Sequence, residues 1–273
     1  DGQAITNIAA KPYEIATNAE LAYSRFTLSN GNLTCNGGCT GLAVANRSSG
    51  TVTFSGASKV LSTGGATAVA LSGNTGATVQ FDGGGLQIAT TSANGFGATA
   101  GGTVTVTGAG NTITATTGVA LNVANTSIGA AGLIFQSIDK NGAGNGIVLN
   151  ATGTLGGLSV TGAGTAGSGG TIRNGSTGVL LTNTRNVSLN RMQLNDFGDY
   201  AIRGTSVVNF ILDNSVVSGV NGNDAGAQEG SIRFDNLTGT AMIRSSSISG
   251  AATNNVQVGN TAGTLDITVS GTT

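Results

Sequence analysis

The 273-residue chain has no tryptophan, no histidine and one proline, and only 8% of its residues are charged. Without histidine, the chain lacks the most common general acid or base and the most common metal ligand. Its 11 basic residues are balanced by 12 acidic residues, for a net charge of −1. Nucleic-acid binding needs a basic patch, so we expect no nucleic-acid partner.

Long apolar runs are also missing. No segment approaches the ~20 apolar residues of a membrane-spanning helix, so we expect no membrane span. No signal peptide is visible at Asp1, which fits a mature form or an excised fragment. Hydrophobic residues still make up 38% of the chain, and this content with a net charge near zero disfavours disorder.

Glycine is abundant, at 47 residues, and it separates short apolar triplets together with Asn and Thr. The stretch from Gly178 to Leu194 is the clearest unit. Its triplets begin at Val179, Val187 and Met192, and each ends at a polar pair. Strands that are this short and this often broken predict one coil of a solenoid, with each strand on a different face.

The same coil recurs along the chain at variable spacing. Coil starts are predicted near Leu42, Val69, Phe96, Val119, Ile147, Val179, Ile202, Ile232 and Val256. A constant strand pattern with a variable coil length indicates loops of different size on a fixed cross-section. We therefore predict an all-β fold, a right-handed parallel β-helix of about nine coils with three short strands per coil and one continuous core.

The N-terminal region differs in composition. It contains the only proline, and a short helix is expected from Pro12 to Tyr23. We assign residues 1–34 to an N-terminal cap or an assembly arm that packs on a neighbouring molecule, and residues 35–273 to the parallel β-helix. The C-terminal end still has strand character, so either a further domain follows or this end stacks on another molecule.

Asparagines follow the first strand of several coils and predict an asparagine ladder. The residues are Asn74, Asn125, Asn183, Asn236 and Asn260. Asparagine tolerates the left-handed backbone of a tight corner, and stacked coils would place these amides about 4.8 Å apart. The alternative is that an Asn-rich chain has Asn at many positions by chance.

With these coils, the chain resembles the right-handed parallel β-helix repeat family, the pectate-lyase-like solenoids. The similarity covers residues 40–270, and it is greatest to the Gly/Thr/Asn-rich repeats of large secreted bacterial surface proteins and adhesins. The resemblance implies a fold more than a function, because lyases, hydrolases, adhesins and structural filaments share this coil.

Two cysteines, Cys35 and Cys39, lie in the string TCNGGCT. A disulfide in an oxidising compartment is the favoured interpretation. Half a zinc site is the alternative, but it would need carboxylates or a second chain. We expect no metal and no cofactor.

Arg203 and Arg233 each follow an inward isoleucine at the same coil position. Alternation predicts that both point outward, one coil apart, and two like charges this close need an anion between them. Asp199 and Glu229 precede the two strands and could serve. The arrangement is either a surface salt-bridge ladder or a groove that binds an acidic sugar through Asp199, Arg203, Glu229 and Arg233.

No catalytic residues are assigned. Paired carboxylates at Asp196 and Asp199, or at Asp199 and Glu229, are the only candidates for glycoside chemistry. We therefore predict a non-enzymatic, extracellular or cell-surface β-solenoid with a structural or adhesive role, one form of which is head-to-tail assembly into filaments. Its expected partners are other copies of itself, further domains of a larger chain, and surface glycans. The alternative is a carbohydrate-binding or carbohydrate-cleaving β-helix.

Overall fold

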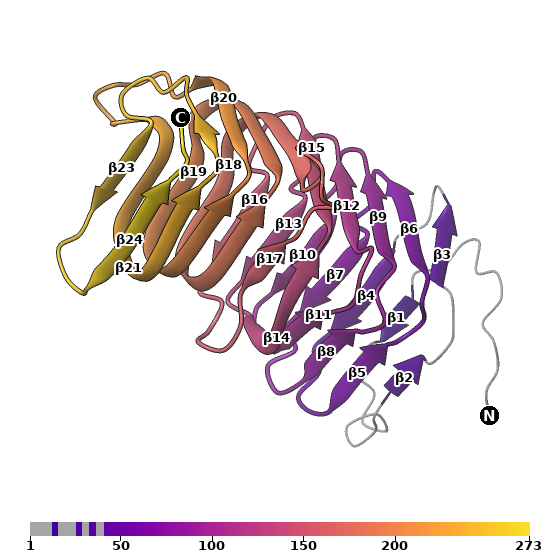
Figure 1. Ribbon diagram of the computed structural model, residues 1–273. Helices are drawn as coiled ribbons and strands as arrows, with labels where there is room; N and C mark the ends of the chain where they lie inside the picture. The colour runs from indigo at the N-terminus through magenta and orange to yellow at the C-terminus, as the bar shows by residue number, and fades with distance from the viewer. Residues whose placement is uncertain (1–12, 16–25, 29–32, 37–40) are drawn as a thin grey trace.

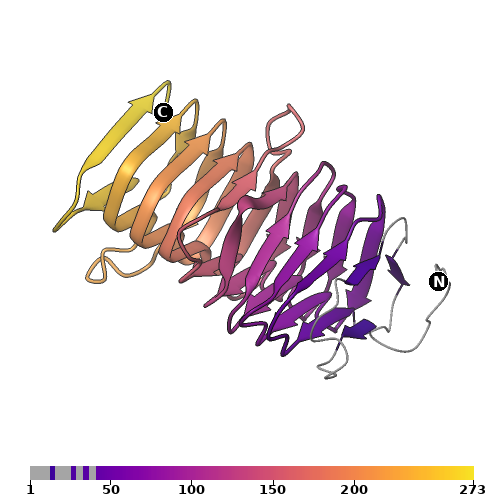
Figure 2. The same ribbon diagram turned by 90° about the horizontal axis from the view of Figure 1, so that it is seen from below.

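A computed structural model describes residues 13–15, 26–28, 33–36 and 41–273. These residues form an all-β parallel solenoid of about nine turns, without a helix in the described ranges. Figure 1 shows the turns stacked in chain order, and Figure 2 shows the same stack from below. The predicted fold class is confirmed.

Each turn of the N-terminal half has three strands, one in each of three stacked positions. The first position holds β1 (Tyr13–Ile15), β4 (Leu42–Ala45), β7 (Val69–Ser72), β10 (Phe96–Thr99), β13 (Leu121–Ala124) and β16 (Ile147–Asn150). The second holds β2 (Phe26–Leu28), β5 (Thr51–Phe54), β8 (Thr78–Phe81), β11 (Thr103–Val106), β14 (Ser127–Phe135) and β17 (Leu158–Val160). The third holds β3 (Leu33–Asn36), β6 (Lys59–Gly64), β9 (Leu86–Thr90), β12 (Thr112–Ala115) and β15 (Ser137–Asn141).

In the C-terminal half the strands continue around the corners. The elements are β18 (Gly170–Asn190), β19 (Met192–Asp213), β20 (Val216–Asn221), β21 (Gly230–Arg244), β22 (Ser247–Ile248), β23 (Val256–Gly259) and β24 (Leu265–Ser270). The polar breaks predicted around Met192 are corners: Asn183 lies inside β18, Asp196 lies inside β19, and Arg191 joins the two strands. Asn183, Arg191 and Asp196 have φ of 47°, 59° and 60°. One left-handed residue turns the chain and leaves the ladder of hydrogen bonds almost unbroken.

The turns are in register along the whole stack. The coil starts at Leu42, Val69, Phe96, Ile147, Val179, Ile202, Ile232 and Val256 lie in one column of paired residues. The start predicted near Val119 lies two residues later, at Leu121. Gly118-Val119 belongs to the preceding corner, so the apolar Val119 was a misleading marker.

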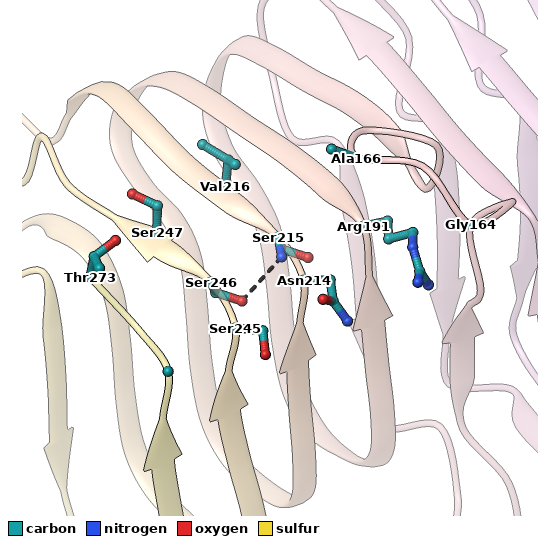
Figure 3. Close-up of a pocket in the computed structure, with 11 residues that line it drawn as sticks. Gly164, Ala166, Arg191, Asn214, Ser215, Val216, Ser245, Ser246, Ser247 and Thr273 are labelled. Atoms are coloured by element: carbon teal, nitrogen blue, oxygen red, sulfur yellow. Dashed lines mark hydrogen bonds between the residues drawn. The ribbon is translucent and has the colours of Figure 1, made fainter.

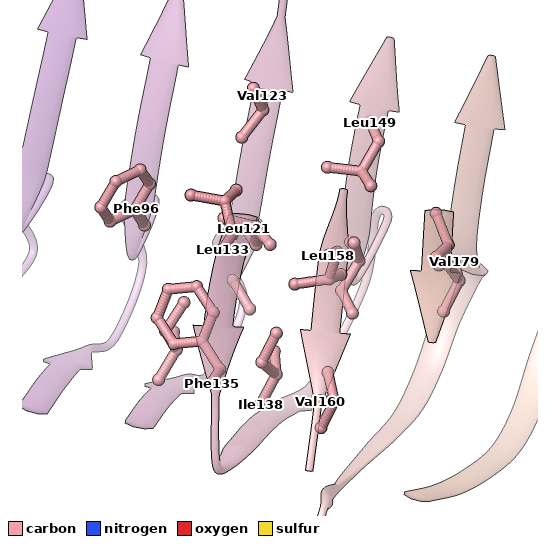
Figure 4. Close-up of a cluster of buried hydrophobic side chains, with 14 of the residues drawn as sticks. Phe96, Leu121, Val123, Leu133, Phe135, Ile138, Leu149, Leu158, Val160 and Val179 are labelled. Atoms are coloured by element: carbon pink, nitrogen blue, oxygen red, sulfur yellow. The ribbon is translucent and has the colours of Figure 1, made fainter. Parts of the chain in front are cut away.

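The core is one continuous apolar column, part of which is shown in Figure 4. Phenylalanines fill its N-terminal half in contact with one another. The ring centroids of Phe54 and Phe81 are 5.0 Å apart, those of Phe81 and Phe96 are 5.6 Å apart, and those of Phe96 and Phe135 are 6.2 Å apart. The aromatic rings thus contribute a large buried apolar area to a core whose turns each contain few residues.

The helix expected from Pro12 to Tyr23 is wrong where the structure describes it. Tyr13–Ile15 form β1, which pairs in parallel with β4. Strands β2 and β3 pair in the same way with β5 and β6. The free edge of β4 offers hydrogen-bond partners along an extended segment, and this outweighs the helical preference of the local sequence. Residues 16–23 lie outside the described residues, and the assignment of residues 1–34 to a cap or arm stays a prediction.

Candidate functional site

Arg203 and Arg233 pair in register on β19 and β21, one turn apart, as the alternation predicted. Both side chains are largely covered, at 19% and 18% exposure. The anion between them is Asp235. One carboxylate oxygen forms an ion pair with the Arg203 guanidinium, and the other lies 3.5 Å from Arg233 Nε. The bridging role considered for Asp199 and Glu229 is therefore filled by Asp235, which follows Arg233 at i+2 on the same face of the strand.

A loop of residues 222–229 also contacts this surface. Arg233 Nη1 donates to the carbonyl oxygen of Ala227 at 3.0 Å, and Tyr200 Oη donates to the same oxygen at 3.0 Å. The Arg203 guanidinium carbon lies 5.6 Å from the centroid of the Tyr200 ring, within the range of a cation–π contact. The donors that a carboxylate ligand would need are thus engaged by Asp235 and by the chain itself.

Of the two remaining predicted site residues, Glu229 belongs to this loop, whereas Asp199 lies on β19. Glu229 Oε2 accepts hydrogen bonds from the backbone amides of Asn223 and Asp224, both at 2.8 Å, and so closes the base of the loop. Burial, followed by repulsion from Glu229, raises the pKa of the Asp199 carboxyl above its ordinary value. The two carboxylates are therefore electrostatically coupled.

The segment that contains the arginine pair has a negative net charge. Residues 196–235 hold six carboxylates and two arginines. An excess of carboxylates in this segment disfavours the binding of an acidic sugar. The salt-bridge interpretation of Arg203 and Arg233 accounts for these contacts, and binding of a ligand there stays a prediction. In the described residues no three Cys, Asp or Glu side chains converge as they would around a metal ion.

The five asparagines of the predicted ladder do not occupy one uninterrupted column. Asn125, Asn183 and Asn236 have left-handed φ of 51°, 47° and 61°. They alternate with Ala151 and Ser206, which have φ of 52° and 54° at the intervening turns. What recurs in the five turns from Asn125 to Asn236 is the left-handed corner, and asparagine is one of several residues that supply it.

The other two members form inter-turn hydrogen bonds of a different kind. Asn74 lies one residue past its corner and is 2% exposed. Its amide donates to the Val44 carbonyl at 2.9 Å and accepts from the Arg47 backbone amide at 3.0 Å. Asn260 accepts from the Leu237 amide at 2.9 Å. Both side chains therefore join a turn to the previous one through its backbone.

The sequence analysis did not identify buried polar residues at the other corners. Asn111 accepts from the Leu86 amide at 2.9 Å and donates to the Ile134 carbonyl at 3.0 Å, so it joins three successive turns. Ser215 and Ser246 each accept a backbone hydrogen bond from the turn before, both at 3.1 Å. Each of these polar residues directly follows a glycine or another residue with a left-handed backbone, and this pattern in the sequence could have identified them.

Two buried lysines are the other residues that were missed. Lys59 and Lys140 are each 1% exposed. The Lys59 ammonium donates to the carbonyls of Gly56, of Asp82 at 2.8 Å and of Gly84 at 2.6 Å. Lys140 donates to Gly142, to Ala143 at 2.8 Å and to Gly144 at 3.3 Å. Burial lowers the pKa of both amines, and the nearby Asp82 opposes the shift at Lys59.

One hollow of about 390 Å³ lies along the corner that precedes β20 and β22. Figure 3 shows Ser215 and Ser246 hydrogen-bonded at its floor, with Arg191 to one side and Ala166 on the loop above. Arg191 is the single charged residue of the lining, which contains no carboxylate. The hollow thus offers hydroxyl groups and one cation, without the carboxylate pair that glycoside hydrolysis requires.

The predicted disulfide falls partly outside the described residues. Cys35 belongs to β3, where it pairs in register with Leu61, whereas Cys39 lies outside the described ranges. The disulfide between them therefore stays a prediction.

In the described ranges no helix has the length and apolar character needed to cross a bilayer. Comparison with models of protein families, with curated proteins and with solved structures found no match to this chain. The parallel β-solenoid therefore stands on the structure alone.

Proposed function

We propose that the chain is a structural or adhesive β-solenoid of an extracellular or cell-surface protein, related to the pectate-lyase-like β-helix repeats that its coils resemble. The observation that carries this proposal is the uninterrupted register from Leu42 to Val256. A single core column with short corners makes a rigid rod, because each turn is fixed by the turns on either side.

The surface chemistry supports the same proposal. Residues 26–138 carry only Arg47, Lys59 and Asp82 as charged residues, and Lys59 is buried. The outward positions of β4, β7 and β10 are the small residues Ala43, Ala70 and Gly97. A flat, nearly neutral wall suits packing against a cell-surface layer or against other rods, where it presents little charge repulsion.

Binding to a panel of immobilised cell-wall and matrix materials would test this function, with polysaccharide cleavage measured in parallel. We expect the chain to bind these immobilised materials through its flat, nearly neutral wall. We expect it to leave the length of polysaccharide chains unchanged. A Gly97→Lys variant, which places a charge on the flat wall, should weaken this binding. Shortening of any polysaccharide by the purified chain would overturn the structural role.

The hollow beside Arg191 supports a second candidate, a carbohydrate-binding solenoid. Serine hydroxyls, the Asn214 amide and one guanidinium are groups that hydrogen-bond to sugars, and the volume falls within the range of small-ligand sites. Binding of an oligosaccharide that is lost in Arg191→Ala, but kept in Arg173→Ala, would favour this candidate. Arg173 is an exposed arginine one turn earlier, in register with Asn195 and outside the lining of the hollow.

A further inference from the structure

A second hollow, of about 450 Å³, lies along the corner between the first and second strand positions. Its lining comes from four successive turns, from Thr75 after β7 to Gly153 after β16. Described turns lie on both sides of it, and Figure 1 shows β4 and β5 on one side and β18 on the other. The hollow is therefore a feature of the wall of the stack and belongs to neither of its ends.

Three hydroxyl residues of the lining occupy one position in successive turns. Thr78 pairs in register with Thr103, and Thr103 pairs with Ser127. Each of the three precedes a buried residue of its strand, so alternation turns its own side chain toward the surface. Neighbouring strands of a sheet are about 4.8 Å apart, so the hollow presents a row with one hydroxyl per turn.

The polar side chains of this hollow are free, in contrast to those of the arginine pair. Four of them form no hydrogen bond within the part of the chain that the structure describes, namely those of Thr78, Thr103, Asn125 and Ser127. The buried Thr126 is engaged instead, because its hydroxyl accepts from the Gly101 amide at 3.3 Å and so joins two turns. The hollow thus combines a fixed backbone with unused donors and acceptors, which lowers the cost of ordering on binding.

Charge is missing from this part of the surface. The lining contains no charged residue, and the sequence from Gly83 to Ile138 contains none either. A charged ligand would lose water here without gaining an ion pair, which is costly. A neutral ligand with many hydroxyl groups fits better, because hydroxyl and amide side chains both donate and accept hydrogen bonds. The volume of the hollow falls within the range of small-ligand sites.

We propose that this hollow binds a neutral, β-linked polysaccharide, which lies along the axis of the solenoid with about one hexose unit per turn. The inference rests on the proposed adhesive function and names the ligand and the site of adhesion. The spacing of the turns is close to the length of one hexose in an extended β-linked chain, so the row of hydroxyls meets equivalent groups of successive sugars. The flat wall of Ala70 and Gly97 ends at this corner, so a polysaccharide held there also contacts the wall.

Binding should depend on the length and the charge of the sugar. Calorimetric titration of the full chain with β-linked glucose and N-acetylglucosamine oligomers of two to six units would measure it. We expect the affinity to rise with each unit and to level off at about four, because the lining spans four turns. Glucuronate oligomers of the same linkage and length are the control, and we expect them to bind more weakly, because each unit carries a carboxylate.

Thr103→Val tests the row of hydroxyls at its centre. The substitution replaces the hydroxyl with a methyl group of similar size, and we expect the affinity to fall about threefold to tenfold. Thr114→Val is the matched control, because Thr114 is an exposed threonine of the same turn on β12, outside the hollow. We expect this variant to bind as the unchanged protein does. Circular dichroism would show that both variants keep their β structure.

Asn125→Gly tests the amide at the corner. Asn125 has φ of 51°, so glycine keeps the left-handed backbone and removes only the side chain. We expect the affinity to fall several-fold. Asn183→Gly is the control, because Asn183 has φ of 47° at the same corner two turns later and lies outside the hollow.

Four outcomes would overturn the proposal. They are no binding of any neutral oligomer, equally tight binding of glucuronate oligomers, equal losses in Thr103→Val and Thr114→Val, and binding that is lost in Arg191→Ala but kept in Thr103→Val. The last would place the sugar in the hollow beside Arg191. Binding to immobilised cell-wall material that responds to Gly97→Lys, without binding of any oligomer, would leave the adhesive function in place and remove only this site.

Discussion

Lys59 and Lys140 place charged side chains inside a core of Val, Ile, Leu and Phe. An ammonium in such surroundings is costly unless hydrogen bonds replace its water. Each lysine finds three backbone carbonyls from Gly-rich corners, which have no side chains to crowd the ammonium. The lysine in turn donates hydrogen bonds to backbone carbonyl oxygens that point inward from these corners.

Lys140→Ala should therefore destabilise the protein. The carbonyls of Gly142, Ala143 and Gly144 would lose their common donor, and we expect the free energy of unfolding to fall by about 2–3 kcal/mol. Denaturant titration would measure it. Arg173→Ala, an exposed cation one turn on, is the control and should change stability by less than about 0.5 kcal/mol. Equal effects would contradict the role assigned to Lys140.

Asp199→Asn should stabilise the protein slightly at neutral pH, by less than about 1 kcal/mol, because this carboxyl is partly exposed. Its raised pKa means that the ionised form is disfavoured in the folded state. This penalty is present above the folded pKa and disappears as the pH falls through the folded and then the unfolded pKa. Thermal melts of both proteins from pH 7 to pH 3 should show a difference that closes on acidification. A difference that widens instead would refute the raised pKa of Asp199.

The disulfide between Cys35 and Cys39 predicts that neither thiol reacts with an alkylating reagent before reduction. After reduction, both should react. Mass spectrometry of the labelled chain would count the modified residues. Labelling of both cysteines in the unreduced protein would exclude the bond, together with the oxidising compartment inferred from it.

At the scale of the element, a strand in this molecule is defined by what lies on its two faces. Val187 is 1% exposed and pairs with the buried Phe210, whereas Ser188 lies on the outer face. The corner at Asn186, with φ of 53°, sets this phase, because a left-handed residue resets the alternation of the next strand.

Val187→Asp should consequently cost about 4–5 kcal/mol of stability, since it buries an unpaired carboxylate and removes an apolar side chain. Ser188→Asp should be tolerated to within about 0.5 kcal/mol, because its carboxylate stays in water. Urea unfolding of the two variants gives the comparison. Similar losses from both would mean that the inward and outward faces of this strand are assigned wrongly.

The whole molecule is a stack in which each turn contacts only its neighbours. Stability is then a sum over turns and the contacts between them, with no contact joining distant parts of the chain. The Leu42 column makes the turns equivalent in cross-section although their loops differ in length. The unit that can be removed from such a molecule is therefore one complete turn.

Deletion of residues 96–120 removes one such turn, because Phe96 is in register with Leu121. We expect the shortened chain to keep a β-rich circular dichroism spectrum and cooperative unfolding, since Val69 can then pair with Leu121. Deletion of residues 96–107 alone should abolish folding, because each later strand would move by one position around the cross-section. A half-turn deletion that folds as well as the full-turn deletion would contradict the modular stack.

The sequence alone determined the solenoid, the phase of its strands and the in-register stacking of Arg203 on Arg233. These features depend on alternation and on breaks between short strands, which are local and can be read in one turn at a time. The sequence also indicated left-handed corners at Asn125, Asn183 and Asn236, because asparagine is favoured in that conformation.

Only the tertiary structure decided which groups meet between turns. Asp235, rather than Asp199 or Glu229, bridges the arginines, and the column of Asn183 contains Ser206 and Ala151 between its asparagines. Tyr13–Ile15 form a strand because β4 lies beside them. The loops vary in length, so the number of residues between two stacked positions differs from turn to turn. A sequence pattern therefore cannot specify which residues stack on one another. The register of the backbone hydrogen bonds does specify them.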